Sequence, residues 1–306
     1  MAKNKRVEGA EISIIILSFN TKGLLRDCLN SLKKIRSEIP FEVIVADNGS
    51  VDGSLEMVKK QFPWVIPLDN KTNIGFARGN NAARKVARGK YILFLNSDTI
   101  VYDGTLKRSV EFLREHPDVG AMTCKLVLAN GQLDKDARRS FPTPWVSLTH
   151  LILKLDKFFP KSRLFAKYWY GYMDEDETHE VDALQGAYFL APKKVLDSVK
   201  WFSEDYFLDG EDLDLCWKIR TKSYKIFYYP KVSILHLKGA SKGKNVTTKK
   251  RVPLASRLKF RMASVNSMEI FYKKFLWKRY PLALNLFVLF GIKCFKAARF
   301  MATVLK

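Results

Sequence analysis

Short apolar runs alternate with amphipathic segments over the first 125 residues of the chain. The runs at 12–19, 41–48 and 91–95 are almost uninterrupted, which is typical of strands buried on both faces of a parallel sheet. Between them, apolar residues recur at helical spacing, as in the segment 21–35. Strands that alternate with helices of this length predict βαβ units on a mostly parallel sheet. We also expect helices at 54–62, 76–87 and 105–115, and strands near 65–68 and 119–123.

The pattern is less regular from residue 126 to residue 180, and order returns after it. The run 181–192 predicts a strand that contains Gly186. The segment 207–219 predicts the start of a helix with Asp209 at its N-cap. Residues 224–241 predict one or two strands that end near His236.

Polar side chains stand at the carboxyl ends of three predicted strands. Any one such group is also good turn or helix-cap chemistry, and the DNGS sequence after the second strand is an ordinary turn by itself. In open parallel sheets, however, ligands bind beyond the carboxyl ends of the strands. Three polar ends together therefore predict a site along one sheet edge. They comprise Ser18 and Asn20, then Asp47 and Asn48, then Asn96, Ser97 and Asp98.

Four carboxylates, Asp209, Glu211, Asp212 and Asp214, lie within six residues at the start of the helix predicted in 207–219. Acidic residues favour a helix N-terminus because they oppose the positive end of the helix dipole. A carboxylate within hydrogen-bond reach of a hydroxyl is also what general-base catalysis requires. The pattern is compatible with both roles.

His236 closes an apolar run and is followed by a glycine- and lysine-containing stretch at 238–244. A single histidine is usually structural, but a neutral imidazole is also a good metal ligand. Gly239 and Ser241, placed among lysines, suggest a loop that contacts phosphate. The pattern therefore nominates His236 as a candidate metal ligand.

The 306 residues, 47% of them hydrophobic, can bury one large core or one core plus a small appended unit. The formal charge of +22 favours anionic partners: nucleic acid, an anionic membrane or phosphate-bearing ligands. Residues 249–306 hold 14 Lys and Arg but a single acid, Glu269, so about half of the excess charge lies there. The N-terminus lacks a signal-peptide pattern and the four cysteines form no CxxC pair, so we expect a cytoplasmic protein with reduced thiols.

The basic C-terminal segment also carries apolar residues, and its run 282–295 is 14 residues long, interrupted by Asn285 and Lys293. A helix that spans a bilayer needs about 20 apolar residues, so this run is short for that purpose. An amphipathic or shallowly inserted helix flanked by cations suits the anionic cytoplasmic face of a membrane. The alternative is an ordinary packing helix with a basic exposed side.

Seven stretches occur along 12–241 in an order that resembles family 2 glycosyltransferases, which are inverting enzymes of the GT-A fold. They are SIIILSFN, VADNGSVDGS, NIGFARGNN, LFLNSD, VDALQGAYFL, DGEDLDLCWK and HLKGAS. Within the family, the chain is most similar to the bacterial rhamnosyltransferase-like branch. The resemblance implies a Rossmann-like, mostly parallel α/β sheet flanked by helices. It also implies a GT-A catalytic domain at 1–250, with a nucleotide-sugar half at about 10–125 and an acceptor half at about 126–250, and a basic helical tail at 251–306 that associates with membrane.

The resemblance also assigns roles to residues. Asp98 would be the last residue of the DxD-like metal motif, whose first Asp is replaced here by Asn96, and His236 would be the second protein ligand of Mn²⁺ or Mg²⁺. Asp212 would be the catalytic base, with Glu211 as the alternative. Gly186, Ala187 and Tyr188 would face the sugar and the acceptor. The nucleotide sugar would be bound by Ser18, Asn20, Asp47, Asn48, Asn73, Gly75, Arg78, Asn81, Asn96 and Ser97.

The implied reaction is transfer of L-rhamnose from dTDP-rhamnose to a polyprenyl-diphosphate-linked or polysaccharide acceptor in cell-envelope glycan synthesis. The protein would work as a peripheral enzyme on the inner face of the cell membrane. The same chemistry with a UDP- or GDP-sugar is the alternative, because donor choice depends on side chains in irregular loops. A basic nucleic-acid-binding protein is a further alternative, but the sequence has no RNP, KH, zinc-finger or helix-turn-helix signature, so we expect no nucleic acid partner.

Overall fold

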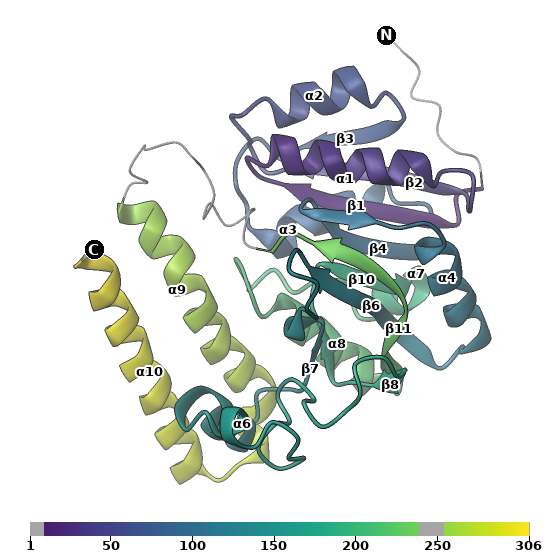
Figure 1. The fold of residues 1–306 in the computed structure, drawn as a ribbon. Coiled ribbons are helices and arrows are strands. Elements are labelled where there is room, and N and C mark those ends of the chain that lie inside the picture. The colour runs from purple at the N-terminus through teal and green to yellow at the C-terminus, as the bar shows by residue number, and fades with distance from the viewer. Residues whose placement is uncertain (1–8, 239–253, 306) are drawn as a thin grey trace.

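The computed structural model describes residues 9–238 and 254–305. A twisted central sheet has the strand order β3-β2-β1-β4-β10-β6-β11-β5, and helices cover it (Figure 1). Its strands are β1 (Ile12–Ser18), β2 (Phe41–Asp47), β3 (Val65–Asp69), β4 (Tyr91–Asn96), β5 (Thr99–Val101), β6 (Val119–Leu128), β10 (Tyr188–Pro192) and β11 (Lys225–His236), with β8 (His179–Glu180) paired to β11. A separate two-stranded sheet joins β7 (Arg138–Arg139) to β9 (Ala183–Leu184).

Helices connect the strands and continue into a C-terminal hairpin (Figure 1). The longer helices of the α/β part are α1 (Lys22–Lys34), α2 (Ser54–Gln61), α3 (Phe76–Asn81), α4 (Thr105–Glu115), α7 (Lys193–Ser198) and α8 (Glu211–Thr221). Between β7 and β9 lie the short helices α5 (Pro144–Ser147) and α6 (Leu155–Phe158), separated by a π-helical turn at Leu148–Ile152. The hairpin consists of α9 (Leu254–Phe271) and α10 (Leu282–Val304).

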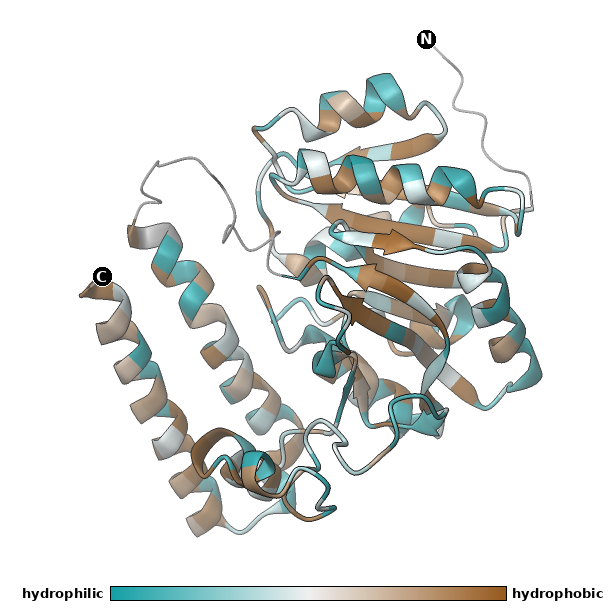
Figure 2. Cartoon of the chain, in the orientation of Figure 1, coloured by the Kyte–Doolittle hydropathy of each residue, from teal (hydrophilic) through white to brown (hydrophobic). Residues whose placement is uncertain are grey.

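The first four strands of the sheet, β3, β2, β1 and β4, are all parallel, as the apolar runs predict. Nearly every residue of β1, β2 and β4 is buried, and Figure 2 shows hydrophobic residues concentrated on these strands. Ser18 pairs with Asp47, and Leu17 pairs with Asn96. The register therefore brings the three polar strand ends to one edge of the sheet.

The second half of the sheet is completed by β10, which runs antiparallel between β4 and β6, and by β11, which runs parallel to β6. The last residue of β11, His236, pairs with Leu128 at the end of β6 and with Thr99 at the start of β5. The strand predicted near 119–123 extends to Leu128, and this extension carries the chain to the same sheet edge.

The prediction of one continuous strand at 181–192 is wrong. The segment divides into β9, in the small sheet, and β10, in the main sheet, with Gln185 and Gly186 between them. A Cβ at Gly186 would lie 3.0 Å from the Phe76 ring, so the chain crosses close to α3 at this break. The predicted helix at 76–87 is also shorter: α3 ends at Asn81 and a 3₁₀ turn follows at 82–85.

The N-cap predicted at Asp209 is wrong as well. Helix α8 begins at Glu211, and Gly210 occupies the cap position with a φ of 88°. That positive φ favours glycine, and a Cβ there would lie 2.9 Å from the Cβ of Ser267 in α9. Asp212 is therefore the second residue of the helix.

The C-terminal hairpin packs on the α/β part through α9 and the turn after it. The Ser267 hydroxyl donates a hydrogen bond to the Leu208 carbonyl (3.2 Å), and the Phe275 ring stacks on Trp217 of α8 with centroids 5.3 Å apart. Lys274 lies 2.7 Å from the Asp214 carboxylate. These contacts place α9 against the loop that enters α8.

Helix α10 has 23 residues, so the apolar run expected to end at 295 belongs to a longer helix. Asn285 does not interrupt it, because its buried amide donates to the carbonyls of Trp277 and Tyr280 and its oxygen accepts from the Tyr272 hydroxyl. Within residues 9–238 and 254–305, no helix combines the length and the apolar character needed to cross a membrane.

Candidate active site

Asp98 and His236 come from different strands and meet at the carboxyl edge of the sheet. Asp98 follows β4, His236 ends β11, and the His236 Nε2 lies 3.5 Å from the Asp98 Oδ1. The two segments are also joined through the backbone, because the Leu237 N–H donates to the Asp98 carbonyl (2.8 Å). Both side chains are buried. The two residues nominated as metal ligands are thus neighbours.

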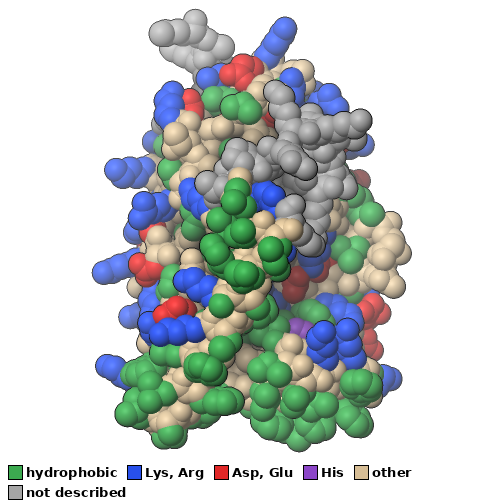
Figure 3. All heavy atoms as spheres, turned by 90° about the vertical axis from the view of Figure 1, so that its left-hand side faces the viewer, with side chains coloured by type: hydrophobic (Ala, Val, Ile, Leu, Met, Phe, Trp, Pro, Cys, Tyr) green, Lys and Arg blue, Asp and Glu red, His purple; other side chains and the backbone are tan. Residues whose placement is uncertain are grey.

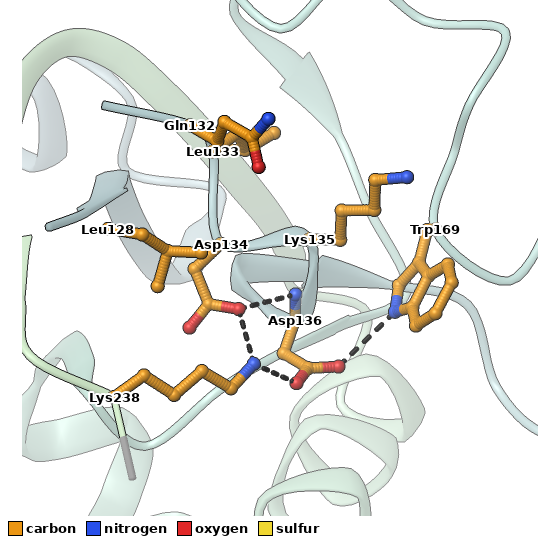
Figure 4. A pocket seen from close by; sticks show the side chains of 8 residues that line it. All are labelled: Leu128, Gln132, Leu133, Asp134, Lys135, Asp136, Trp169 and Lys238. Carbon is orange, nitrogen blue, oxygen red and sulfur yellow. Dashed lines mark hydrogen bonds and ion pairs between the residues drawn. The ribbon is translucent and has the colours of Figure 1, made fainter. Parts of the chain in front are cut away.

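Behind His236 lies a third buried carboxylate, Asp134. The His236 Nδ1–H donates to the Asp134 Oδ2 at 2.9 Å, which leaves Nε2 turned toward Asp98. Lys238 donates to Asp134 (2.6 Å) and to Asp136 (2.5 Å), and the Trp169 indole donates to Asp136 (3.2 Å). Figure 4 shows Lys238 placed between the two carboxylates. A carboxylate that fixes the second ring nitrogen in this way is the usual partner of a metal-ligating histidine.

These contacts shift the pKa values of the two buried partners. Burial alone would lower the pKa of His236, but the hydrogen bonds with Asp134 and Asp98 outweigh it and raise this pKa to about 9. Burial alone would raise the pKa of Asp134, but the hydrogen bonds from His236 and Lys238 outweigh it, and this pKa lies below its ordinary value. Without a bound cation, the imidazole is therefore protonated at neutral pH.

A cavity of about 260 Å³ opens beside this network. Trp169, Lys135 and Gln132 line it together with the two carboxylates and Lys238 (Figure 4). Its position next to Asp134 and its mixture of an aromatic ring with polar groups make it part of the candidate site.

Asp212 and Glu211 open helix α8 but have different surroundings. The Arg139 guanidinium donates to the Asp212 Oδ2 at 2.5 Å, and it also donates to the Leu184 carbonyl (2.9 Å). Glu211 is buried, and its Oε2 has no hydrogen-bond partner among the described residues. Burial, with Asp212 and Asp209 nearby, raises the pKa of Glu211 well above its ordinary value. Burial therefore favours the protonated form of Glu211, whereas Asp212 is paired with Arg139.

Asp136 links the two clusters electrostatically. Burial would raise its pKa, but the positive charges of Arg139 and Lys238 outweigh this and lower it. Positively and negatively charged side chains thus alternate from the Asp98–His236 pair to the N-terminus of α8. Three of these groups, Asp134, Asp136 and Arg139, were not predicted from the sequence, where their signal is an acid pair followed by an arginine pair in the irregular stretch DKDARR.

The predicted nucleotide end of the site contains an unsatisfied carboxylate oxygen. The Asp47 Oδ1 accepts hydrogen bonds from the backbone N–H groups of Gly49 (3.1 Å) and Ser50 (2.8 Å). Its Oδ2 is buried and has no hydrogen-bond partner within the described part of the chain. An N–H donor of a nucleobase would satisfy this oxygen. Beside it, the hydroxyls of Ser18, Thr21 and Ser97 form a chain with spacings of 3.1 and 3.0 Å.

Several predicted nucleotide-binding residues shape the surrounding loops. The Asn20 side chain accepts from the Val51 N–H (2.8 Å), and its backbone has a φ of 54°. Asn48 donates to the Gly75 carbonyl (3.1 Å), and Asn73 accepts from the Gly75 N–H (3.1 Å). These bonds position the loop that leads into α3.

Arg78 and Asn81, on α3, are turned toward the segment around residue 203 instead. Arg78 lies 3.5 Å from Glu204, and Asn81 donates to the Phe202 carbonyl (3.0 Å). Both residues thus have protein partners in the segment 202–204.

Two of the three residues proposed to face the sugar and acceptor are fully buried. Ala187 is one of them, and its carbonyl accepts a hydrogen bond from the backbone N–H of Asn96 (3.1 Å), a partly exposed member of the predicted nucleotide-binding set. Tyr188 is the other, and its hydroxyl donates to Ser109 of α4 (3.0 Å). Tyr188 therefore points into the core and does not face a ligand.

The donor set at Asp98 and His236 suits a divalent cation that is only partly held by protein. Among the described residues, no cluster of three or more His, Cys, Asp and Glu side chains is arranged to hold a metal ion. One carboxylate and one oriented imidazole would leave the other positions to phosphate oxygens and water, as is usual for cations that bind with a diphosphate. The predicted phosphate-contacting loop at 239–244 lies outside the described residues.

Comparisons with known proteins identify the family and the fold of the chain. A family model described as "Glycosyl transferase family 2" matches residues 13–168. An N-acetylglucosaminyl-diphospho-decaprenol L-rhamnosyltransferase from Mycobacterium tuberculosis is 24% identical over 247 residues, which are 76% of this chain and 78% of that protein. A poly(ribitol-phosphate) beta-glucosyltransferase from Bacillus spizizenii is 34% identical over 113 residues, 35% of this chain but only 18% of that protein.

A solved structure of similar fold is the mannosyltransferase PcManGT from Pyrobaculum calidifontis, in complex with GDP-Man and Mn²⁺. The two structures match with a TM-score of 0.54 at 16% sequence identity, and the match covers 97% of this chain and 86% of the mannosyltransferase chain. At this level of identity the likeness concerns the fold alone.

Proposed function

The chain belongs to glycosyl transferase family 2 and is a glycosyltransferase with the GT-A fold, and we propose that it is an inverting, metal-dependent enzyme of cell-envelope glycan synthesis. It moves a sugar from a nucleoside diphosphate onto an acceptor hydroxyl. The observation that carries the proposal is the Asp212–Arg139 ion pair, which Asp136 and Lys238 link to the network of Asp134, His236 and Asp98. The Asp212–Arg139 pair is suited to the acceptor hydroxyl, and the Asp98–His236 pair is suited to the diphosphate leaving group.

Asp212 accepts the proton of the attacking hydroxyl. Its Oδ2 keeps a second lone pair while Arg139 occupies the first, so the carboxylate can receive a proton without losing its orientation. The acceptor oxygen bonds to the anomeric carbon as the bond to the diphosphate oxygen breaks. A single displacement of this kind inverts the anomeric configuration.

Asp98 and His236 would hold the divalent cation, Mn²⁺ or Mg²⁺, and the imidazole nitrogen favours Mn²⁺. When bound, the cation would neutralise the charge that develops on the diphosphate leaving group. Asp134 keeps the imidazole oriented for this task. Asp47 accepts a hydrogen bond from the nucleobase, for which its buried Oδ2 is available.

We assign L-rhamnose, from dTDP-rhamnose, as the transferred sugar and a polyprenyl-diphosphate-linked glycan as the acceptor. The support is the similarity to the mycobacterial L-rhamnosyltransferase, whose name specifies a diphospho-decaprenol acceptor, over three quarters of this chain. A UDP- or GDP-sugar is the alternative donor, because donor choice depends on side chains in irregular loops. The basic C-terminal hairpin would hold the enzyme on the inner face of the cell membrane, close to such an acceptor.

The experiment is an assay of nucleoside diphosphate release by the purified protein with a panel of dTDP-, UDP- and GDP-sugars and Mn²⁺, with and without a polyprenyl-diphosphate-linked acceptor. We expect acceptor-dependent release with dTDP-rhamnose and a product of inverted anomeric configuration by NMR. Release only with a UDP- or GDP-sugar would establish the alternative donor. No release with any donor, with or without acceptor, would overturn the proposal.

A further inference from the structure

The chain between β7 and β9 exposes a cluster of large apolar side chains that the catalytic machinery does not use. Ile152 is 69% exposed, Phe158 74% and Phe159 53%, and Leu151, Leu153 and Leu164 are about half exposed. Adjacent exposed residues of this size are uncommon on soluble monomers and mark an interaction surface. They surround α6, which lies beside the lower ends of α9 and α10 in Figure 1.

A second apolar cluster lies on the N-terminal half of α10. Leu282, Leu286 and Phe290 follow one another at four-residue spacing on the outer side of the helix, together with Phe287, and they are 56–71% exposed. The opposite side is directed toward α9, with Asn285 and Ile292 buried. Figure 3 shows hydrophobic side chains gathered at the same lower end of the molecule in two neighbouring groups.

The charge around these clusters identifies the occupant. Exposed cations surround the α6 cluster, and the two acids that line the cavity beside it are both paired: Asp156 is hydrogen-bonded to His150 (2.9 Å), and Glu175 lies 3.2 Å from Lys125. Helix α10 has no acidic residue. A second copy of the chain would bring positive charges against positive charges, whereas an anionic bilayer is complementary to both apolar and cationic groups. The cations are Lys154, Lys157, Lys161, Arg163 and Lys167 near α6, and Lys293, Lys296 and Arg299 on α10.

We propose that residues 151–164 and the outer face of α10 form one membrane-docking surface for an anionic lipid bilayer. Two contact points fix the orientation of the enzyme, whereas a single amphipathic helix leaves rotation about its own axis free. Residues 140–150 connect Arg139 on β7 to the α6 cluster, and α9 packs on the loop that enters α8. Docking therefore sets the height of the Asp212–Arg139 pair above the bilayer. This inference rests on the proposed function in that the acceptor is taken to be lipid-linked.

The test is flotation of the full chain with liposomes of phosphatidylcholine alone or with phosphatidylglycerol added, without donor or acceptor. We expect binding only to the anionic vesicles. The double variant I152D/F158D should bind at least about tenfold more weakly, since each large apolar side chain contributes roughly a factor of ten or more on burial. F287D/F290D should behave in the same way, and Y102D, at an exposed aromatic far along the chain from both clusters, should bind like the wild type.

Unchanged binding of I152D/F158D would overturn the two-point surface and leave α10 as the only contact. Equal binding to neutral vesicles would overturn the role of the cations. Concentration-dependent dimerisation lost in I152D/F158D, without vesicle binding by the wild type, would assign the surface to a second copy instead. Because flotation needs no turnover, its result stands apart from the donor assay: an inactive protein that docks leaves this inference intact.

Discussion

Arg139 and Asp212 form an ion pair in which the two side chains are only 12% and 8% exposed, with Nη2 and Oδ2 2.5 Å apart. The pair distinguishes two adjacent carboxyl groups that sequence cannot rank. Asp212 is compensated by a cation, whereas Glu211 is buried beside acids and has a raised pKa. This difference in surroundings supports our proposal of Asp212, rather than Glu211, as the base.

Replacing each carboxyl with its amide should separate these roles. We expect D212N to lower kcat by about 10²–10⁴-fold, because it removes the proton acceptor, while donor affinity stays the same. E211Q should retain kcat within a few-fold, because an amide resembles the protonated acid that burial favours at this position. Steady-state kinetics with donor titration by calorimetry provide the measurement. A large loss of kcat in E211Q, with residual transfer in D212N, would make Glu211 the base.

Breaking the ion pair from the other side should destabilise the fold. We expect R139M to lower the free energy of unfolding by about 3–5 kcal/mol, because it leaves a buried carboxylate without its cation. The double variant R139M/D212N should recover much of this loss, since neither charge remains. Urea unfolding of the three variants and the wild type measures the coupling. Additive effects would show that the pair contributes no coupling energy.

Asp134 should affect metal binding without contacting the metal. We expect D134N to weaken Mn²⁺ binding by about 10–100-fold, because the amide no longer orients the His236 ring as a carboxylate does. Electron paramagnetic resonance of free Mn²⁺, recorded with a nucleoside diphosphate present, gives the affinity without turnover. D174N is a suitable control, because Asp174 lies outside the His236 network. Equal Mn²⁺ affinity in D134N and wild type would assign Asp134 a purely structural role.

The pKa of His236 predicts a proton linkage. Because this pKa is raised to about 9, the imidazole is protonated at pH 7 and cannot bind a cation until it loses its proton. Apparent Mn²⁺ affinity should therefore rise about tenfold per pH unit between pH 6 and 8, with about one proton released per ion bound. Calorimetry in buffers of different ionisation enthalpy measures this release. A pH-independent affinity with no proton release would exclude His236 as a ligand.

The features that the sequence predicted well are those that depend on local pattern. Strands buried on both faces appear as apolar runs, so β1, β2 and β4 were predicted within a residue or two, and their polar ends followed from them. Asp134, Asp136 and Arg139 were missed because they lie on an irregular turn, where a side chain acquires its role only from segments distant in sequence.

Two wrong predictions have related physical causes. A strand buried on both faces gives no sign of which face meets the ligand, so the sequence could not show that Tyr188 points toward α4. In α10, a polar residue in an apolar run looks like an interruption, but Asn285 is buried and satisfies carbonyls of the preceding turn. In both cases, a tertiary contact determines the direction and the role of the side chain.

Strand β5 has only three residues, yet it returns the chain alongside β11 immediately after Asp98 and pairs Thr99 with His236. The separation of the two proposed ligands is therefore a property of backbone register. Side chains alternate between the faces of a strand, so a slip of one residue would turn the imidazole to the opposite face. The parts of the segment between β5 and β11 that lie outside β6 and the turn carrying Asp134 can consequently change in length without altering the separation of the two proposed ligands.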